Sequence, residues 1–224
     1  MISFTMRPPP GITAIVVLAL AGLAPTLLAQ GGTVWSFDEE TVEALPRGFT
    51  LSAMRQDTPG TWLVRRDGGN GAFVHTAGTA QGGYAMALAP HNSLSDVIVS
   101  VRLRLSGGGR AGGVVWRYQD PNNYYAAVLD LTRGTLFMYL FRNGNRITVE
   151  AEDDLELDPN AWHTLRVVHE RSSVYVALGG IRVFEERGGR LDRTLGAGQI
   201  GVLAAGDSDV SFDDLRIEPG RPRR

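Results

Sequence analysis

Two residue types are missing from this sequence. It contains no Cys and no Lys, and its 22 basic residues are all Arg. The absence of Cys excludes a disulfide scaffold, a Cys-ligated zinc site and a thiol nucleophile. The basic residues are balanced by 24 Asp and Glu residues, so the net charge is only −2. A nucleic-acid-binding domain requires a strong basic excess, and we therefore expect no nucleic-acid partner.

Helical periodicity is also missing after residue 30. About fifteen short alternating or β-branched segments lie between Thr33 and Glu218, separated by clusters of Gly, Asn, Asp and Pro. The clearest is Val97–Leu105, in which Val97, Val99 and Val101 point to one face and Ser100 to the other. With 43% hydrophobic residues, the chain can bury one core. This pattern predicts an all-β, two-sheet antiparallel β-sandwich or jelly roll.

The N-terminus reads as a targeting segment. Arg7 precedes an uncharged apolar stretch, Gly11–Leu23, and Ala29 offers a small residue for cleavage. We expect residues 1–29 to be a secretory signal peptide, which predicts an exported protein, periplasmic or secreted. The alternative is an uncleaved membrane anchor, because Gly11–Ala29 approaches the length that spans a bilayer. Residues 30–219 then form one domain and residues 220–224 a basic tail.

The two ends of the predicted domain share a short pattern. Ser36–Glu39 and Ser211–Asp214 both read Ser-Phe-Asp-acid. This predicts similar structural roles for the first and last strands, as neighbours in one sheet.

Several segments resemble the concanavalin A-like lectin/glucanase superfamily of jelly rolls. The resemblance extends to an exported bacterial branch near laminin-G-like and 3-keto-disaccharide hydrolase-type (DUF1080) domains. The segments that carry it are Phe37–Glu39, Leu45–Phe49, Thr61–Val64, Ala111–Tyr125, Trp162–Val167, Gly198–Leu203 and Asp207–Leu215. The resemblance implies a concanavalin A-like jelly roll. It implies no single function, because the superfamily contains lectins, glycosidases, lyases and adhesion modules.

A catalytic carboxylate pair is not evident. Glucanases of this superfamily carry a Glu-x-Asp-x-x-Glu strand. Glu152 and Asp154 begin this pattern, but Leu157 stands where the closing Glu belongs. We interpret Glu150–Asp158 as a solvated acidic edge.

Aromatic and Arg residues on the three strands between Gly112 and Arg142 are the sugar-facing candidates, because rings stack on pyranose C–H faces while Arg and Asp bind hydroxyls. Alternation predicts that Trp116 and Tyr118 share one face, opposite Arg117. Arg117, within an apolar strand, should either pair with an acid or face a polar groove. The candidate ligand-binding residues are Arg117, Tyr125, Asp130, Tyr139 and Arg142. Trp35, Trp62 and Trp162 are predicted to be packing anchors.

A structural calcium ion is the one metal that the resemblance implies, near the paired terminal strands. Its hard-oxygen ligands would be Asp38 and Asp213 with backbone carbonyls.

Three functions remain open on this sequence. The first is an exported, non-catalytic module that binds carbohydrate or another cell-surface ligand. The second is a hydrolase or lyase acting on 3-keto-glycosides or related glycosides. The third is a structural protein-interaction domain. The missing carboxylate pair favours the first.

Overall fold

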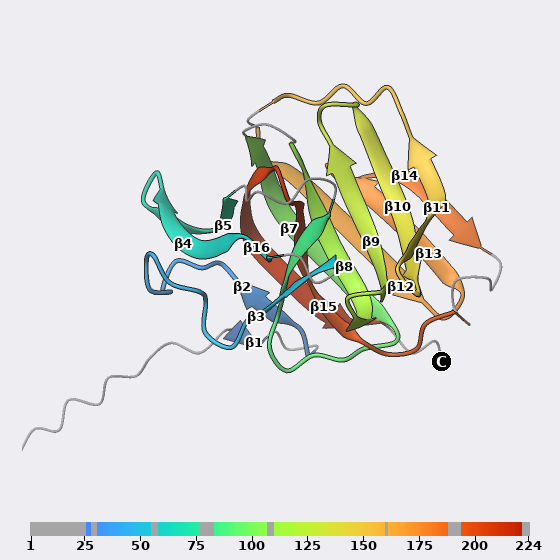
Figure 1. Ribbon diagram of the computed structural model, residues 1–224, viewed down its shortest axis with the longest axis horizontal. Helices are drawn as coiled ribbons and strands as arrows, with labels where there is room; N and C mark the ends of the chain where they lie inside the picture. The colour runs from blue at the N-terminus through green and yellow to red at the C-terminus, as the bar shows by residue number, and fades with distance from the viewer. Residues whose placement is uncertain are drawn as a thin grey trace, which may run out of the picture.

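Two antiparallel sheets packed face to face make up the molecule (Figure 1). The computed structural model describes residues 26–27, 31–54, 58–76, 83–106, 110–159, 161–187 and 194–220. Within these ranges no residue is α-helical, and no helix is long and apolar enough to cross a membrane. The predicted all-β, two-sheet antiparallel sandwich is confirmed.

In each sheet, the spatial order of the strands differs from their order along the chain. Sheet A contains, side by side, β1 (Thr26–Leu27), β2 (Thr33–Trp35), β16 (Asp209–Pro219), β7 (Val97–Ser106), β12 (His163–Glu170), β13 (Ser173–Leu178) and β14 (Ile181–Arg187). In the same sheet, β5 (Asn70–Thr76) also pairs with β16, and β4 (Thr61–Asp67) pairs with β5. Sheet B contains β11 (Asn145–Glu152), β10 (Thr135–Arg142), β9 (Asn123–Asp130), β8 (Ala111–Asp120), β15 (Gln199–Ala205), β6 (Tyr84–Leu88) and β3 (Thr50–Ala53).

The predicted signal segment falls almost wholly outside the described residues. Only Thr26 and Leu27 of it are described, and they form β1, which pairs with Val34 and Thr33 of β2. Residues 1–25 and 28–29 lie outside the described ranges, as does the predicted tail after Gly220. Cleavage after Ala29 therefore remains a prediction.

The last strand, β16, organises sheet A. It pairs with β2, β5 and β7, so that Leu215 lies opposite Trp35 and Phe212 opposite both Phe73 and Leu103. The prediction that the first and last strands are neighbours is confirmed by the pairing of β16 with β2.

The core fills the space between the sheets. Along β7, the residues at every second position from Val97 to Leu105 are at most 1% exposed, as the period of two predicts. Trp62 stacks on Phe212 with ring centroids 5.9 Å apart and contacts Phe73 at 5.1 Å. Burying one such large apolar side chain contributes about 1.5–3 kcal/mol. Trp35 and Trp62 are core anchors as expected.

Trp162 is not a core anchor. It lies on the outer face of sheet A, with the guanidinium groups of Arg102 and Arg104 at 5.0 Å and 4.9 Å from its ring centroid. Both Arg residues alternate outward on β7, so the ring is held by cation–π contacts rather than by core packing. The prediction for this Trp was wrong because the residue precedes β12 and is outside its alternation.

A β-bulge at Arg117 interrupts β8. Arg117 has φ 47°. At this point the register of β8 shifts in its pairing with β15 and in its pairing with β9. Because a bulge inserts one extra residue, it reverses the side on which later residues point. Trp116 therefore faces sheet A whereas Tyr118 faces outward. The prediction that these two rings share a face was wrong for this reason.

A glycine beside this strand permits the bulge. A Cβ atom added to Gly198 would lie 2.4 Å from the backbone carbon of Arg117 and 2.5 Å from the carbonyl oxygen of Tyr118. Only a residue without a side chain lets the two backbones approach this closely.

The Arg117 side chain binds three loops at one end of the sandwich, and we call this set of contacts the clasp. It is 1% exposed; its Nε donates to the Ser95 carbonyl at 2.7 Å and its Nη1 to the Leu195 carbonyl at 3.1 Å. Its Nη2 lies 3.5 Å from the Arg171 carbonyl and 3.8 Å from the Asp96 carboxylate. Asp96 also accepts a hydrogen bond from the Arg171 amide at 2.9 Å. Arg117 thus joins β8 of sheet B to the β12–β13 turn of sheet A.

A second polar contact joins the sheets beside this clasp. Trp116 Nε1 donates to Nδ1 of His169 on β12 at 2.9 Å, and His169 is fully buried. Burial, reinforced by the positive charge of Arg117, lowers the pKa of His169 from 6.5 to about 3. The ring is therefore neutral in the folded protein at ordinary pH, with Nδ1 as the acceptor.

Replacing Arg117 should test the clasp. We expect Arg117→Met to lower the free energy of unfolding by about 3 kcal/mol, because it strips charged donors from buried carbonyls. Arg142→Met, at an exposed position at the end of β10, is the matched control and should change it by less than about 0.5 kcal/mol. Urea unfolding measures both. Equal stability of the two variants would show that the clasp contributes nothing.

His169 should make stability fall in acid. The unfolded chain takes up a proton near pH 6.5 that the folded protein resists down to pH 3, so the stability contributed by this group is present above pH 6.5 and is lost as the pH falls toward 3. His169→Asn keeps an acceptor for Trp116 but cannot titrate. Between pH 7 and pH 4, the original protein should lose about 3 kcal/mol more than the variant. Urea unfolding followed by Trp fluorescence checks this, and parallel pH profiles would refute it.

Candidate functional site

The outer face of sheet B carries a continuous aromatic surface. Along β10, Leu136, Met138 and Leu140 point into the core, so the residues between them point outward. Neighbouring strands add further rings to the same side. We call this surface the aromatic face; its members are Tyr84, Tyr118, Tyr124, Phe137, Tyr139 and Phe141.

The rings of the aromatic face contact one another in an unbroken series. Phe137 stacks on Tyr139 at 5.1 Å, Tyr139 meets Phe141 edge-on at 6.1 Å, and Tyr124 stacks on Phe141 at 4.3 Å. Tyr84, from β6, reaches across the sheet to Phe141 at 5.9 Å. These are the separations at which aromatic pairs attract beyond simple burial, so the rings are held in fixed positions.

Two Arg side chains cover the rim of this face. The guanidinium of Arg146 lies 5.1 Å above the Tyr139 ring, and that of Arg133 lies 5.9 Å above the Phe137 ring. Asp130 holds Arg133 through an ion pair of 3.6 Å. Phe137 and Tyr84 are half-buried, whereas the other four rings are buried, so solvent reaches the aromatic face only at its rim.

The phenols of the aromatic face stay protonated. Burial raises the pKa of Tyr84, Tyr124 and Tyr139 above the ordinary value of 10, and nearby Arg146 offsets only part of this rise. The Tyr118 hydroxyl lies 2.7 Å from the Ser52 hydroxyl, and burial raises its pKa too. These groups therefore cannot act as bases near neutral pH.

A carboxylate pair suited to glycoside cleavage is not found on the described part of this face. Asp130 caps its own turn, because its Oδ1 accepts the amides of Thr132 at 3.0 Å and Arg133 at 3.2 Å. On the acidic edge, Glu150 and Glu152 belong to the outermost strand β11, and Asp153 accepts a hydrogen bond from the Thr135 hydroxyl at 2.7 Å. The interpretation of this segment as an acidic edge agrees with the structure.

The five candidate ligand-binding residues do not form one site. Arg117 is committed to the clasp, and Tyr125 is fully buried between the sheets, stacked on Trp116 at 5.6 Å. Of the two alternatives for Arg117, the structure has the one in which it pairs with an acid, Asp96. The expectation that Tyr125 lines a groove was wrong, because the alternation of β9 turns its ring into the core. Arg142 is exposed at the end of β10, beside the Asn143–Gly144 turn. Tyr139 and Asp130 lie on the aromatic side of sheet B, and their contact with a ligand stays a prediction.

Sequence reasoning missed most of the aromatic face. Phe137 and Phe141 alternate with Tyr139 in one strand, and this period of two was a sufficient signal for them. Tyr84 lies on β6, four strands away from β10 in sheet order, so the sequence contains no signal for its contact with Phe141.

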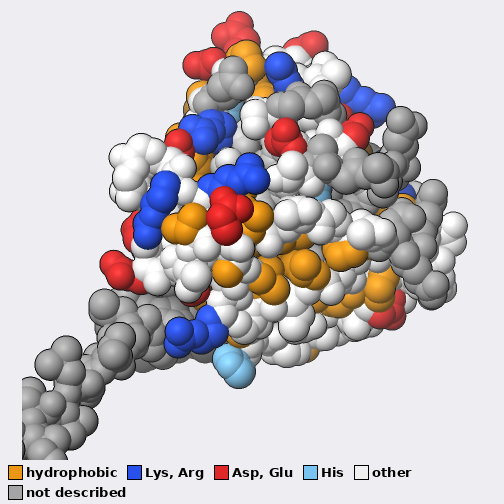
Figure 2. Space-filling model, turned by 60° about the vertical axis from the view of Figure 1, so that its left-hand side comes forward, with side chains coloured by type: hydrophobic (Ala, Val, Ile, Leu, Met, Phe, Trp, Pro, Cys, Tyr) orange, Lys and Arg blue, Asp and Glu red, His pale blue; other side chains and the backbone are white. Residues whose placement is uncertain are grey.

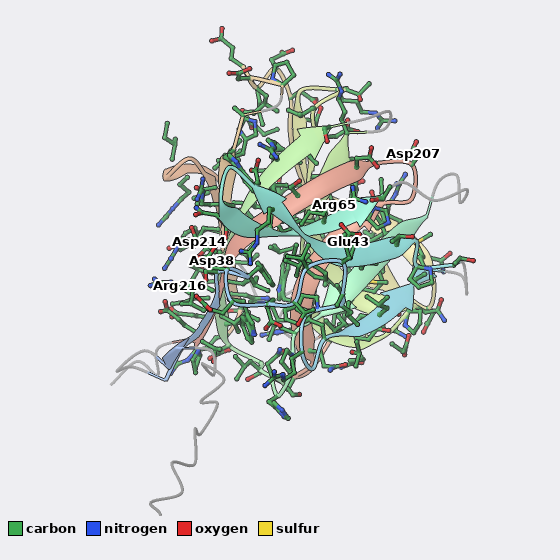
Figure 3. All side chains as sticks on the ribbon, turned by 90° about the vertical axis from the view of Figure 1, so that its left-hand side faces the viewer. Asp38, Glu43, Arg65, Asp207, Asp214 and Arg216 are labelled. Carbon is green, nitrogen blue, oxygen red and sulfur yellow. The ribbon has the colours of Figure 1, made fainter. Side chains whose placement is uncertain are left out.

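The two candidate calcium ligands lie near each other, but an Arg side chain supplies a cation there. Arg102 Nη1 is 3.4 Å from the Asp213 carboxylate and 3.3 Å from that of Asp214, while Asp38 accepts the Gly71 amide at 2.8 Å. Burial, with the charges of Asp214 and Asp38, raises the pKa of Asp213 to about 6. Figure 3 shows Asp38 and Asp214 on the same side of the molecule. Among the described residues, no group of three Asp, Glu or His side chains is arranged to hold a metal ion.

The fold is shared with solved structures of low sequence identity. No protein-family model and no curated protein matches the sequence. A carbohydrate-binding module, CBM66 from Bacillus subtilis, is 20% identical with a TM-score of 0.60, covering 76% of this chain and 95% of that one.

Two further structures illustrate the range of proteins with this fold. Domain 4 of AbnA, an extracellular GH43 arabinanase from Geobacillus stearothermophilus solved with arabinotriose, is 17% identical with a TM-score of 0.52, covering 77% of this chain and 82% of that one. A putative glycosyl hydrolase from Parabacteroides distasonis is 12% identical with a TM-score of 0.51, covering 81% of this chain and all of that one. The chain therefore shares the two-sheet antiparallel β-sandwich fold of these structures, in agreement with the jelly roll that the resemblance implied. The link to 3-keto-disaccharide hydrolases stays a prediction.

Calcium addition tests the remaining metal prediction. If Asp38 and Asp213 bind Ca²⁺, millimolar CaCl₂ should raise the melting temperature while MgCl₂ does not, and Asp213→Asn should remove the effect. Because Arg102 already neutralises Asp213, Arg102→Gln should strengthen the calcium response. An unchanged melting temperature in both the original protein and Arg102→Gln would reject the site.

Proposed function

We propose that this protein is an exported, non-catalytic carbohydrate-binding module whose ligand stacks on the rim of the aromatic face. The observation that carries the proposal is the series of fixed rings on sheet B, covered at Phe137 and Tyr139 by two long Arg side chains. Aromatic rings stack on the C–H face of a sugar, and guanidinium and phenol groups bind its hydroxyls.

At the rim, a ligand could replace the Arg side chains that now cover the rings. The guanidinium groups of Arg146 and Arg133 occupy the space above the rings where a sugar ring would lie. Arg133 is 66% exposed, so it can move aside without losing burial. After such a movement, its donors would still lie within reach of the sugar hydroxyls.

The similar structures support the same proposal. One is a carbohydrate-binding module and one was solved with arabinotriose. The predicted signal segment supports export. The absence of a carboxylate pair on the described part of the aromatic face favours binding over glycoside hydrolysis or lysis.

A matched pair of variants tests the binding site. Tyr175 on sheet A is also covered by an Arg, with Arg182 at 4.2 Å from its ring, but it lies on the opposite side of the sandwich from the aromatic face. Oligosaccharide binding should weaken about tenfold, or about 1.4 kcal/mol, in Phe137→Ala and stay unchanged in Tyr175→Ala. Calorimetry with arabino-, fructo-, gluco- and 3-keto-oligosaccharides measures this.

Two results would contradict the proposal. Binding that is equally strong in Phe137→Ala would place the sugar elsewhere, and no binding to any oligosaccharide would favour a structural protein-interaction domain. The same samples should show no turnover of 3-keto-disaccharides. Turnover would instead establish the hydrolase or lyase alternative.

A further inference from the structure

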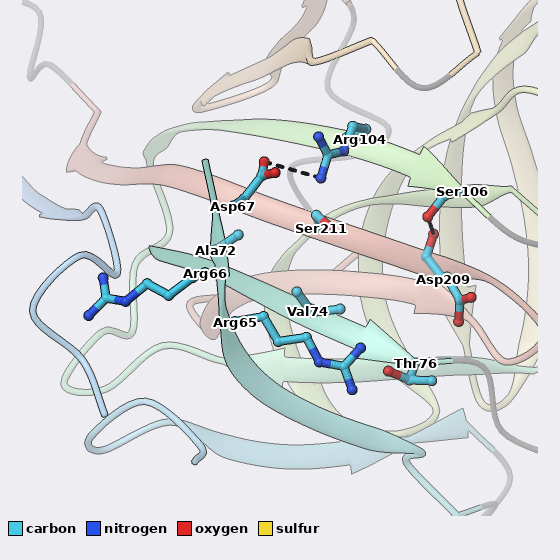
Figure 4. A pocket seen from close by; sticks show the side chains of 10 residues that line it. All are labelled: Arg65, Arg66, Asp67, Ala72, Val74, Thr76, Arg104, Ser106, Asp209 and Ser211. Atoms are coloured by element: carbon cyan, nitrogen blue, oxygen red, sulfur yellow. Dashed lines mark hydrogen bonds and ion pairs between the residues drawn. The ribbon is translucent and has the colours of Figure 1, made fainter. Parts of the chain in front are cut away.

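A second surface feature lies on the outer face of sheet A, on the other side of the sandwich. A hollow of about 210 Å³ opens between the β4–β5 hairpin and strands β16 and β7 (Figure 4). Figure 2 brings this side of the molecule forward and shows Arg and acidic side chains gathered above a strip of apolar ones. The hollow is smaller than a drug-sized pocket, so it suits a ligand of about one sugar ring.

Small side chains in the middle of the face create the hollow. The pairing registers place Ser211 of β16 between Val74 of β5 and Arg104 of β7. Ala72 and Arg65 face each other on β5 and β4. The floor therefore consists of short side chains, whereas Arg65 and Arg104 stand as long walls on opposite sides.

The guanidinium groups on the walls of the hollow form ion pairs with nearby carboxylates. Arg104 Nη2 lies 3.1 Å from the Asp67 carboxylate. Arg65 Nε lies 3.6 Å from the Glu43 carboxylate, and both of those side chains are about half exposed, at 49% and 63%. Such exposed ion pairs contribute little, so a ligand can compete for Arg65. Figure 3 shows Glu43 and Arg65 together on this side of the molecule.

Hydroxyl groups complete the lining. Thr76 lines the hollow, and its hydroxyl oxygen has no hydrogen-bond partner among the described residues. Ser106 donates to the Asp209 carbonyl at 3.5 Å, and Ser211 lies at the floor. Figure 4 shows Arg65 extending past Val74 toward Thr76, whereas Arg66 points out of the hollow.

We propose that this hollow is a second binding site that takes an acidic sugar unit, a hexuronate, with its carboxylate between Arg65 and Arg104. Of the three Arg residues in the lining, Arg65 and Arg104 border the hollow, whereas Arg66 points out of it. A planar carboxylate matches the fork of a guanidinium. The sugar hydroxyls would pair with Ser211 and the Asp209 carboxylate.

The acidic residues of the lining select for a singly charged ligand. Asp67 and Asp209 would repel a phosphate or sulfate ester with more charge, whereas they accept hydrogen bonds from neutral hydroxyls. No described aromatic ring lines the hollow, so recognition rests on charge and hydrogen bonds rather than on stacking. The hollow and the aromatic face lie on opposite sheets, so loss of ligand binding at one site should not change binding at the other.

Binding of glucuronate to the purified full chain tests the site. Titrations followed by NMR or calorimetry would compare glucuronate with glucose, which lacks the carboxylate, and with acetate and inorganic phosphate, which lack the sugar. We expect glucuronate to bind at least tenfold more tightly than each of the three. Arg65→Gln and Ser211→Leu, which fills the hollow from its floor, should each weaken glucuronate binding at least tenfold.

Two controls separate this site from general charge and from the aromatic face. Arg182→Gln removes one positive charge elsewhere on sheet A and should leave glucuronate binding unchanged, as should Phe137→Ala on sheet B. Urea unfolding should show all four variants folded. Loss of glucuronate binding in Phe137→Ala would move the ligand to the aromatic face and overturn the proposal. Equal binding of glucose or phosphate, or no measurable glucuronate binding, would also overturn it.

Discussion

The left-handed backbone of Arg117 is the constraint on which both the core and the aromatic face depend. Its φ of 47° inserts one residue into β8, which sends Trp116 inward and Tyr118 outward. Without the bulge, regular alternation would bury both rings or expose both. The guanidinium then offsets the local disruption by satisfying carbonyls of three loops from a buried position. One residue thereby sets strand register, sheet-to-sheet contact and the membership of the aromatic face.

The two outer faces of the sandwich use Arg in different ways. On sheet B, Arg146 and Arg133 lie over aromatic rings whose other sides are buried, so the charged groups shield an apolar surface from water. On sheet A, Arg102 and Arg104 both contact the Trp162 ring from β7. Arg102 also forms ion pairs with Asp213 and Asp214, and Arg104 forms one with Asp67. The first arrangement leaves rings available beneath a movable cover, and the second leaves a polar hollow. A stacking ligand suits one face, and a charged, hydroxylated ligand suits the other.

Some polar groups of the sandwich are buried without a hydrogen-bond partner, which is energetically unfavourable. The Tyr124 hydroxyl and His169 Nε2 are buried without hydrogen-bond partners among the described residues. Each lies beside a feature that holds it there: Tyr124 in the ring series on sheet B, and His169 under Trp116 and Tyr125. Desolvation without a partner disfavours ionisation, which explains why both groups stay neutral and contribute packing rather than chemistry.

The sequence by itself determined the strands and the fold class, because each rests on local alternation and turn chemistry. Val97–Leu105, the Asn143–Gly144 hairpin and the pairing of the terminal strands could all be read from residue patterns. The tertiary structure alone decided which side chains meet. A bulge shifts alternation by one residue, and its one marker, Gly198, lies just before β15 and far from β8 in sequence, so the sequence could not predict that Tyr118 faces outward. The reach of Tyr84 to Phe141 and the hollow between Arg65 and Arg104 depend on strands far apart in the chain. Their contacts exist only once long-range pairing has set the register.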